Sequence, residues 1–412
     1  MAEWKTVRLG TIVSTNQDTY SPKENWQFVN YLDTGNITMN RIDEVQHINT
    51  SMDKLPSRAR RKVKSNSIIY STVRPNQLHY GIIKEQPENF LVSTGFTVID
   101  VNMEKAVPDY IYYVLTQKEI TEHLQAIAEQ SVSAYPSLKP SDIENLEVLL
   151  PDIDTQKATV AILGVIDEKI KQNTEINNNL EQQAQAIFKE WFIDNPENNE
   201  WSTGTFSELI KSTLNGDWGK EALTGNNTEK VYCIRGADIP EVKAGNKGKM
   251  PTRYILPKNL ATKQLTAGDI VVEISGGSPT QSTGRCTAIT QSLLDRYDSG
   301  MVCTNFCKAI KPKEGYSLFI YYYWQYLYGK GVFFSYENGT TGIKNLDFSG
   351  FIETETILIP PVDKVMAFDD YCKSIFNQIF ANGKQNEHLA VLRDSLLPKL
   401  MSGELDVSDI DL

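Results

Sequence analysis

The sequence has few of the residues from which catalytic and metal-binding sites are most often built. Its 412 residues include four histidines and five cysteines. The cysteines are odd in number and all lie in the second half of the chain, so we expect reduced thiols rather than a disulfide framework. No apolar run approaches the roughly 18 residues of a membrane span, and the N-terminus lacks the basic start and apolar stretch of a secretory signal. These absences lead us to expect a soluble, cytoplasmic protein.

No motif for nucleotide binding or catalysis is found either. The segment Gly245–Met250 has neither the spacing nor the final Ser or Thr of a phosphate-binding loop. Asp154 and Lys157 resemble part of a nuclease site, but they are three residues apart rather than two, and a helix cap explains them. Cys303 and Cys307 would face one side of a single strand, without a second pair at ligand spacing, so core packing is favoured over zinc. We therefore predict no catalytic residue, no metal and no cofactor in this chain.

What the chain does contain is a twofold repeat on the scale of whole domains. Val92–Phe96 parallels Val302–Phe306, and Leu149–Asp154 aligns with Leu358–Asp363. The shift is about 209 residues, far longer than the periods of about 20 to 50 residues found in solenoids and propellers. The chain is therefore expected to hold two copies of one domain.

A long helical pattern follows each copy. Apolar residues recur at steps of three and four from Leu163 to Trp191, and equivalent positions run from Cys372 to Leu400. This is the spacing of a coiled-coil seam, and we expect an antiparallel pair of helices. Buried asparagines at seam positions would fix the register of the pair. The asparagines at such positions are Asn173, Asn177, Asn382 and Asn386.

Several residues are expected to shape these two helices. Asp154 is a plausible N-cap of the first. In the second, Arg393 interrupts the seam and Pro398 should bend or end the helix. The dipeptide Asn382–Gly383 could instead divide the second helix into two pieces.

The predicted fold class is α+β. Two similar mixed α/β domains, residues 1–152 and 196–361, are separated by two long helices, residues 153–195 and 362–412, which form an antiparallel coiled coil with a pseudo-twofold axis. Within the first domain we expect a helix over 108–128, which begins at a proline and has apolar residues at helical spacing. The strands expected there are 27–32, 67–73, 90–101 and 145–150.

The charge is unevenly distributed. The net charge of -11 disfavours phosphate binding by the chain as a whole, since that needs Lys and Arg. However, residues 54–64 and the basic residues between 243 and 263 form one basic island in each copy, before the same strand of the repeat. For one island a solvated charged face is the alternative, whereas two in register favour nucleic-acid contact. The island residues assigned to DNA contact are Arg58, Arg60, Arg61, Lys62, Lys64, Lys247, Lys249 and Arg253.

Two polar loops are repeated in position but not in sequence. Arg74–Gly81 corresponds to Gly276–Arg285, and Ser131–Leu138 corresponds to Asn338–Lys344. Their side chains are of the types that read base edges, although solvent-exposed turns without a partner are the alternative. The aromatic run 321–328 could stack bases, but core packing is favoured. The loop residues assigned to DNA contact are Arg74, Asn76, Gln77, Tyr135, Ser278, Thr280, Gln281, Arg285, Thr340, Thr341 and Lys344.

With these features together, the chain resembles a specificity subunit of a type I restriction-modification system. The resemblance covers nearly the whole chain, and its markers are Leu149–Gln156, Gly339–Leu346 and Leu397–Leu405. Two residues depart from the family pattern. Met366 stands where the first helix has a nearby Gln, and Phe348 stands where a polar residue is usual.

The resemblance implies a non-catalytic DNA-specificity subunit that acts in phage defence. Each domain would be a target recognition domain that reads one half of an asymmetric bipartite site in double-stranded DNA. The helices would act as a spacer and dock two methyltransferase subunits, which bind S-adenosylmethionine. Restriction subunits would bind ATP and Mg, so the complex would have adenine methyltransferase and ATP-dependent endonuclease activity. The alternatives are a protein-interaction scaffold that does not bind DNA and a fused methyltransferase, which the missing Asn/Asp-Pro-Pro-Tyr/Phe motif disfavours.

Overall fold

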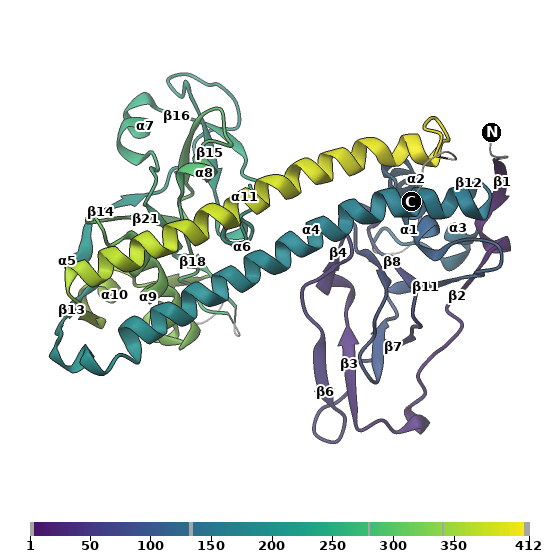
Figure 1. The fold of residues 1–412 in the computed structure, drawn as a ribbon, viewed down its shortest axis with the longest axis horizontal. Helices are drawn as coiled ribbons and strands as arrows, with labels where there is room; N and C mark the ends of the chain where they lie inside the picture. Colours follow the sequence, from purple (N-terminus) through teal and green to yellow (C-terminus); the bar gives the residue numbers. More distant parts are fainter. Residues whose placement is uncertain (1–3, 132–134, 279–280, 340–341, 408–412) are drawn as a thin grey trace. The chain divides into compact units, whose positions relative to one another are not determined.

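The chain forms two compact units in a computed structural model that describes residues 4–131, 135–278, 281–339 and 342–407 (Figure 1). Unit 1 comprises Met1–Asp167 and Val391–Leu412, and unit 2 comprises Glu168–Ala390. Both units contain helices and sheets, which confirms the predicted α+β class. The four segments predicted from the sequence stay a prediction, because the units divide within the two long helices. Of the helices in the described residues, none combines the length and apolarity that a membrane span requires.

Unit 1 is built on two four-stranded sheets and two two-stranded sheets. Its strands are β1 (Lys5–Arg8), β2 (Val13–Thr15), β3 (Phe28–Leu32), β4 (Ile37–Thr38), β5 (Arg41–Ile42), β6 (Gln46–Asn49), β7 (Ala59–Lys62), β8 (Ser67–Ser71), β9 (Tyr80–Ile83), β10 (Phe90–Ser93), β11 (Phe96–Val101) and β12 (Glu147–Leu150). One sheet has the antiparallel order β2-β11-β8-β9. The other has the order β6-β3-β10-β7, in which β3 and β10 are parallel. Strand β1 pairs with β12, which brings the two ends of the domain together.

Two elements predicted for unit 1 are each divided in the structure. The strand expected over 90–101 is two strands, β10 and β11, which belong to different sheets. The helix expected over 108–128 is α1 (Pro108–Thr116) followed by α2 (Lys118–Glu129), and a short helix α3 (Pro140–Glu144) comes before β12. The break falls at Gln117, whose ψ of 144° lies outside the helical range.

Unit 2 repeats the main features of this plan. Its strands are β13 (Ser202–Thr205), β14 (Ile210–Asn215), β15 (Glu229–Ile234), β16 (Thr252–Ile255), β17 (Ile270–Glu273), β18 (Ser275–Gly276), β19 (Cys286–Ala288), β20 (Gly300–Cys303), β21 (Cys307–Pro312), β22 (Glu337–Asn338), β23 (Lys344–Leu346) and β24 (Thr356–Ile359). The sheet β14-β21-β17-β19 has the order of β2-β11-β8-β9, and β15 runs parallel to β20 as β3 does to β10. Strand β13 pairs with β24 as β1 does with β12. The repeat read from the sequence is thus confirmed by the sheet topology.

Both basic islands come before the same strand of the repeat, β8 in unit 1 and β17 in unit 2, as predicted, but they are built from different elements. In unit 1 the island contributes β7, which pairs with β10. In unit 2 it contributes β16, which pairs with β15 at the opposite edge of the equivalent sheet. The same island continues into a helix, α7 (Pro257–Lys263), which lies beside β20 as β7 lies beside β10, with the Leu260 side chain near Gly300. Chain order was preserved between the copies, but a strand in one was replaced by a helix in the other.

The cysteine pair of unit 2 is also arranged differently from the prediction. Cys303 ends β20 and Cys307 begins β21, so the two residues lie on successive strands in different sheets. Both thiols are buried, and burial raises the pKa of Cys307 to about 12. Among the residues that the structure describes, no group of three His, Cys, Asp or Glu side chains could hold a metal ion.

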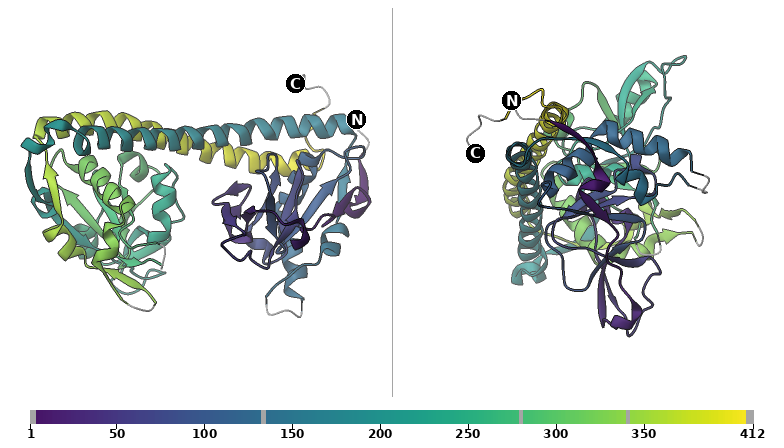
Figure 2. Two further views of the ribbon diagram at one scale, coloured as in Figure 1. Left: turned by 90° about the horizontal axis from the view of Figure 1, so that it is seen from below. Right: turned by 90° about the vertical axis from the view of Figure 1, so that its right-hand side faces the viewer.

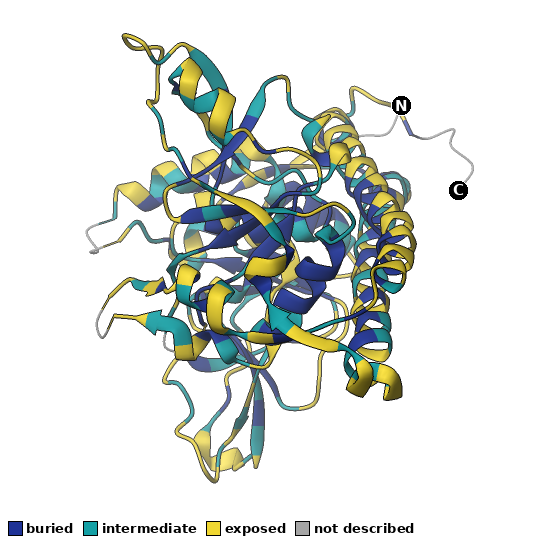
Figure 3. Ribbon diagram, turned by 90° about the vertical axis from the view of Figure 1, so that its left-hand side faces the viewer, coloured by how far each residue is buried: buried dark blue, intermediate teal, exposed yellow. Residues whose placement is uncertain are grey.

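The aromatic run of unit 2 belongs to its hydrophobic core. It forms most of α9 (Ser317–Gly329), in which Tyr321, Tyr322 and Trp324 are buried. Figure 3 shows the buried parts of the strands and helices in dark blue. The Trp324 indole donates a hydrogen bond to the Gly284 carbonyl (2.8 Å), and its ring packs on Phe206, with 5.5 Å between the centroids. Core packing is therefore confirmed for this run. The remaining short helices of the unit are α5 (Phe206–Leu209), α6 (Ile239–Lys243), α8 (Gln291–Leu294) and α10 (Phe348–Thr354).

Two long helices, α4 (Ile153–Phe188) and α11 (Val362–Met401), run antiparallel, as their contacts within unit 2 show. Asn173 donates to the Asn386 side chain (2.8 Å), and Asn382 donates to the Asn177 side chain (2.9 Å). As the residue number rises in one helix, that of its partner falls. In unit 2 both helices lie along one side of the sheets (Figure 2). The predicted antiparallel seam and its asparagines are confirmed.

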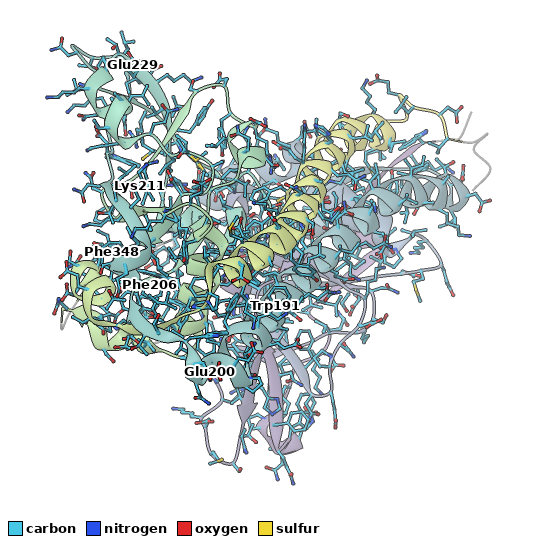
Figure 4. The ribbon with its side chains drawn as sticks, turned by 60° about the vertical axis from the view of Figure 1, so that its left-hand side comes forward. Trp191, Glu200, Phe206, Lys211, Glu229 and Phe348 are labelled. Atoms are coloured by element: carbon cyan, nitrogen blue, oxygen red, sulfur yellow. The ribbon has the colours of Figure 1, made fainter. Side chains whose placement is uncertain are left out.

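The ends and interruptions of these helices differ in part from the prediction. Asp152, rather than Asp154, caps α4 by accepting hydrogen bonds from the Thr155 amide and hydroxyl. Helix α11 runs unbroken through Gly383 and continues for three residues beyond Pro398. A single turn of π-helix, Lys189–Ile193, follows α4 and carries Trp191 against α11, where it packs on Phe368 (Figure 4).

Gly383 is required by packing rather than by a break in α11. A Cβ at this position would lie 1.9 Å from the Gly245 carbonyl oxygen. Gly245 itself has a φ of +85°, which favours glycine, and its added Cβ would lie 2.4 Å from the Ile379 carbonyl oxygen. Two glycines thus let the segment after α6 pack directly against the backbone of α11.

Replacing Gly383 by alanine should therefore lower the thermal unfolding midpoint of the chain. The clash is with backbone atoms that cannot rotate away, and overpacking of this kind costs about 1–3 kcal/mol. Gly164→Ala is the matched control, because it also lies within a long helix but an added Cβ would meet nothing within 4 Å. That variant should gain up to about 1 kcal/mol from helix propensity. Equal effects of the two substitutions in calorimetry would contradict the close approach at Gly383.

Candidate nucleic-acid interface

The two predicted loops of unit 1 meet at one end of its first sheet. Loop A1 (residues 72–79) connects β8 to β9, and loop B1 (residues 131–138) follows α2. The Leu138 amide donates to the Thr72 carbonyl (2.7 Å), and the Arg74 amide donates to the Pro136 carbonyl (3.1 Å). Strand β11 begins at the same end, because Phe96 pairs with Ser71. We call this end of the sheet the loop end.

Loop A1 presents an exposed polar surface on a constrained backbone. Arg74, Asn76 and Gln77 are exposed, and the Arg74 guanidinium lies 5.3 Å from the ring centroid of Tyr135 in loop B1. Arg74 and Leu78 have φ values of 48° and 59°, which cost energy for residues other than glycine. Backbone strain of this kind is common at ligand-binding sites.

Unit 2 brings its two predicted loops together in the same way. Loop A2 (residues 274–285) connects β17 to β19, and loop B2 (residues 338–344) connects β22 to β23. The short strands β18, β23 and β22 form one sheet, so loop A2 is bonded to loop B2. The Ser275 hydroxyl donates to the Asn345 side chain (2.6 Å). This small sheet lies at the loop end of unit 2, because it follows directly after Glu273, the last residue of β17, which pairs with Cys307 at the start of β21.

Two basic residues predicted to contact DNA are instead bound within unit 2. The Arg285 guanidinium donates two hydrogen bonds, of 2.7 and 2.8 Å, to the carboxylate of Glu273, which is 7% exposed. Hydrogen bonding to this carboxylate raises the pKa of Arg285 above its usual value. Lys344 donates to Glu337 (2.7 Å). Burial alone would raise the pKa of Glu337, but hydrogen bonds from Lys344 and Thr283 outweigh it and place the pKa below its usual value.

The other predicted residues of the unit 2 loops are only partly described. The Gln281 amide donates to the Ser278 hydroxyl (3.0 Å), and Gln281 is exposed. Thr280, Thr340 and Thr341 lie outside the described residues.

Most of the basic island of unit 1 is bound to its own domain. Lys62 pairs with Glu24 (2.6 Å), and Arg61 donates to the Thr19 hydroxyl. Lys64 is exposed, but it lies beside Ser67, at the end of the sheet opposite the loops. Arg60 donates to the carbonyl of Ala59 and is half-buried.

Arg58 is the island residue that the structure brings to the loop end of unit 1. It is exposed, and its carbonyl accepts a hydrogen bond from the Thr94 amide (2.8 Å) in the turn between β10 and β11. Of the island residues in unit 1, Arg58 therefore fits the predicted role best.

The island of unit 2 is divided in a similar manner. The Arg253 guanidinium lies 3.7 Å above the centroid of Trp218, is buried, and pairs with Glu221 (3.0 Å). Lys247 lies 4.8 Å from the ring centroid of Tyr297. Lys249 is exposed and comes just before β16, whose first residue lies at the loop end of the β15–β20 pair.

Sequence reasoning missed three exposed apolar side chains around the loops of unit 2. Phe306 is 58% exposed in the turn before β21, Ile343 is 63% exposed in loop B2, and Phe334 is 45% exposed. Phe334 lies 5.2 Å from the ammonium group of Lys344. The aligned motif matched Phe306 to Phe96, which is buried, and thus hid the exposure. Exposed apolar groups among polar loops are typical of binding surfaces.

Comparison with known proteins identifies similar proteins for this chain. The model of the "Type I restriction modification DNA specificity domain" matches residues 1–182. The type I restriction enzyme HindI specificity subunit of Haemophilus influenzae is 26% identical over 470 residues, which cover 98% of this chain and 100% of that protein. The MjaIX specificity subunit of Methanocaldococcus jannaschii is 27% identical over 335 residues, 77% of this chain and 73% of that protein. Residues 1–182 thus match this specificity-domain family, and over nearly its whole length the chain is similar to type I restriction-modification specificity subunits.

A solved structure supports the fold of this specificity subunit. The crystal structure of the type I restriction-modification S subunit from M. genitalium aligns with 97% of this chain and 96% of its own, with a TM-score of 0.53 and 16% identity. A specificity subunit is a non-catalytic component of its system, responsible for DNA specificity.

In this specificity subunit, Arg285 should act as a framework residue. Replacing it with alanine would leave the Glu273 carboxylate buried without its partner, at a cost of about 3 kcal/mol in the free energy of unfolding. Denaturant unfolding of the purified chain measures this loss. Gln281→Ala, an exposed change in the same loop, should alter stability by less than about 0.5 kcal/mol. Full stability of the Arg285→Ala variant, with loss of DNA binding alone, would show that Arg285 reads DNA directly.

Proposed function

We propose that each unit of this specificity subunit reads one half of an asymmetric bipartite site in double-stranded DNA with the loops at its loop end. The observation that carries this proposal is a contrast. The sheets β2-β11-β8-β9 and β14-β21-β17-β19 have the same order, and in both units the same two loops are hydrogen-bonded to each other at one end of this sheet. The loops themselves share almost no sequence. A common framework with different loops is what two readers of different half-sites require.

The chemistry of the exposed loop residues supports direct base contact. Arg and Gln side chains form paired hydrogen bonds with guanine and adenine edges in the major groove. Arg74, Asn76 and Gln77 supply such groups in unit 1, and Gln281 supplies one in unit 2. Apolar side chains contact the thymine methyl group, a role that the exposed Phe306 could fill in unit 2.

The proposed complex also contains partner subunits. Two methyltransferase subunits dock on the paired helices and bind S-adenosylmethionine, and restriction subunits supply ATP- and Mg-dependent cleavage. Since the chain has a net charge of -11 and much of its basic surface is internally paired, the partners are expected to supply many of the phosphate contacts. Target adenines are flipped out of the duplex into the methyltransferase sites.

Substitutions in loop A1 should weaken binding to the first half-site. The double variant Arg74→Ala/Gln77→Ala removes two exposed base-reading groups, and each is worth about 1–3 kcal/mol of discrimination. In the complex with the methyltransferase subunit, affinity for cognate DNA should fall at least about tenfold, while affinity for non-specific DNA changes little. Fluorescence anisotropy at fixed salt measures both affinities.

Lys64→Ala serves as the matched control for this test. Lys64 is exposed and basic, but the structure places it at the other end of the sheet, so its loss should change affinity by less than about twofold. If Lys64→Ala weakened specific binding as much as the loop variant, the loop end would not be the reading surface. An assembled complex without salt-sensitive DNA binding would overturn the proposed function itself.

Methylation mapping should reveal a bipartite motif whose two halves differ. The prediction follows from loops A1 and A2, which differ in length and sequence on equivalent sheets. Long-read sequencing of a host that expresses this subunit with its methyltransferase detects the modified adenines. An exchange of loops A2 and B2 for those of a relative should change one half of the motif only. A palindromic motif would contradict the prediction.

A further inference from the structure

Unit 2 contains a cavity of about 620 Å³ that DNA reading does not use. It lies at the end of the β14-β21-β17-β19 sheet opposite the loop end. The register shows this directly, because Ile270 pairs with Ile310 and Ala288 at the cavity end, while Glu273 pairs with Cys307 at the loop end. The cavity walls come from the segments that leave these strands at 266–269, 288–291 and 311–318, and from α11.

Four lysines line the cavity, and two of them are already bound. Lys311 pairs with Asp269 (2.8 Å), a carboxylate that is 5% exposed, and Lys373 of α11 pairs with Asp369 (2.8 Å), which is 9% exposed. The pairs hold the lysine stems against the wall and leave these two carboxylates little contact with solvent. The charges of these two lysines are therefore neutralised within the unit.

The other two lysines carry uncompensated charge. Lys211 on β14 (Figure 4) and Lys313 after β21 are exposed, and neither has an ion pair or side-chain hydrogen bond among the described residues. The one exposed acidic residue among the described lining residues is Glu314, so the two lysines outnumber the exposed carboxylates. Two free ammonium groups at one opening create a site for carboxylate or phosphate groups.

An apolar rim favours a protein segment over a small ion. Met366 of α11 is 53% exposed, and its side chain lies beside Gly315 at the cavity, where an added Cβ would be 3.4 Å from the Met366 Cγ. The cavity also contains the buried Phe376 and Leu318 in its lining. A volume of this size holds several side chains rather than one ion, and a mixed basic and apolar lining is complementary to an acidic peptide with apolar flanks.

We propose that this cavity receives a segment of the methyltransferase subunit that carries aspartate or glutamate side chains, which pair with Lys211 and Lys313. The inference rests on the proposed assembly with methyltransferase subunits and adds a second contact to the docking on the paired helices. DNA is not the occupant, because the cavity opens at the end of the sheet away from the reading loops. Reading and docking thus use opposite ends of one sheet.

Charge reversal tests this inference. The double variant Lys211→Glu/Lys313→Glu should weaken association with the methyltransferase subunit about tenfold or more, because close charge pairs across an interface are strongly coupled. Isothermal calorimetry or native mass spectrometry with the full chain measures the association. Lys220→Glu/Lys258→Glu is the matched control, since both residues are exposed in unit 2 but lie outside the cavity. It should leave the association within about twofold.

A second measurement identifies the occupant even where a variant folds poorly. A photo-cross-linking amino acid placed at position 313 of the assembled complex should capture a peptide of the methyltransferase subunit that contains Asp or Glu. Capture of a peptide without carboxylates, of the restriction subunit, or of DNA would overturn the inference. Inorganic phosphate provides a further check. If it raised the unfolding midpoint of the wild type but not that of the double variant, the occupant would be a small anion and the inference would also be overturned.

The outcomes also separate this inference from the proposed function. If the wild-type chain assembles with the methyltransferase subunit and the double variant assembles equally well, the inference fails and the proposed function stands. If the wild-type chain does not assemble at all, the proposed function fails with it.

Discussion

The buried asparagines of the α4–α11 pair set the register on which unit 2 depends. Asn177 donates to the Ile379 carbonyl and to the Ala244 carbonyl, so one amide joins both helices and the segment after α6. The side-chain oxygen of Asn177 accepts a hydrogen bond from the Asn382 side-chain amide. A shift of one helix would leave these buried polar groups without partners, at a cost of about 1–3 kcal/mol each. The helices are thereby held in one alignment with each other and with the domain.

This alignment decides which surfaces are available for function. Because α11 is fixed against unit 2, Asp369, Lys373 and Phe376 face the cavity at one end of the β14-β21-β17-β19 sheet. The opposite end of that sheet carries loops A2 and B2, which are tied together by β18 and β23. Because the loops and the cavity wall lie at opposite ends of the sheet, the loop sequences can change without altering the residues of the cavity wall. A subunit that must keep its partners while changing its DNA target needs this separation.

Much of the fold could be predicted because periodicity and duplication are strong signals. The 3–4 spacing from Leu163 to Trp191 specified a helix and its buried face, and the asparagines within the seam specified its register. What could not be predicted depended on contacts distant in the sequence. Asn382–Gly383 has the composition of a helix break, yet α11 continues through it. The glycine is needed there because the backbone of Gly245 packs directly on Gly383. No local pattern encodes that approach.

The candidate site was predicted in its loops but not in its individual charges. Residue type and position identified Arg74 and Arg285 equally well, but Arg74 is exposed whereas Arg285 is bound by Glu273, twelve residues away. Lys62 and Arg253 likewise pair with carboxylates that lie outside the two basic islands, Glu24 and Glu221, respectively. Within their own ranges, residues 54–64 and 243–263, the islands contain no acidic residue.

An acid-free run in a sequence therefore does not imply a basic surface. In a chain with a net charge of -11, folding brings carboxylates from other segments to basic side chains such as Lys62 and Arg253. The basic groups that stay unpaired are the informative ones. Arg58 stands at the loop end of unit 1, and Lys211 and Lys313 stand at the cavity end of unit 2. Two such charges at one cavity are best explained by a partner that neutralises them, whereas an isolated exposed lysine needs none, and the position of this pair away from the reading loops indicates protein rather than DNA.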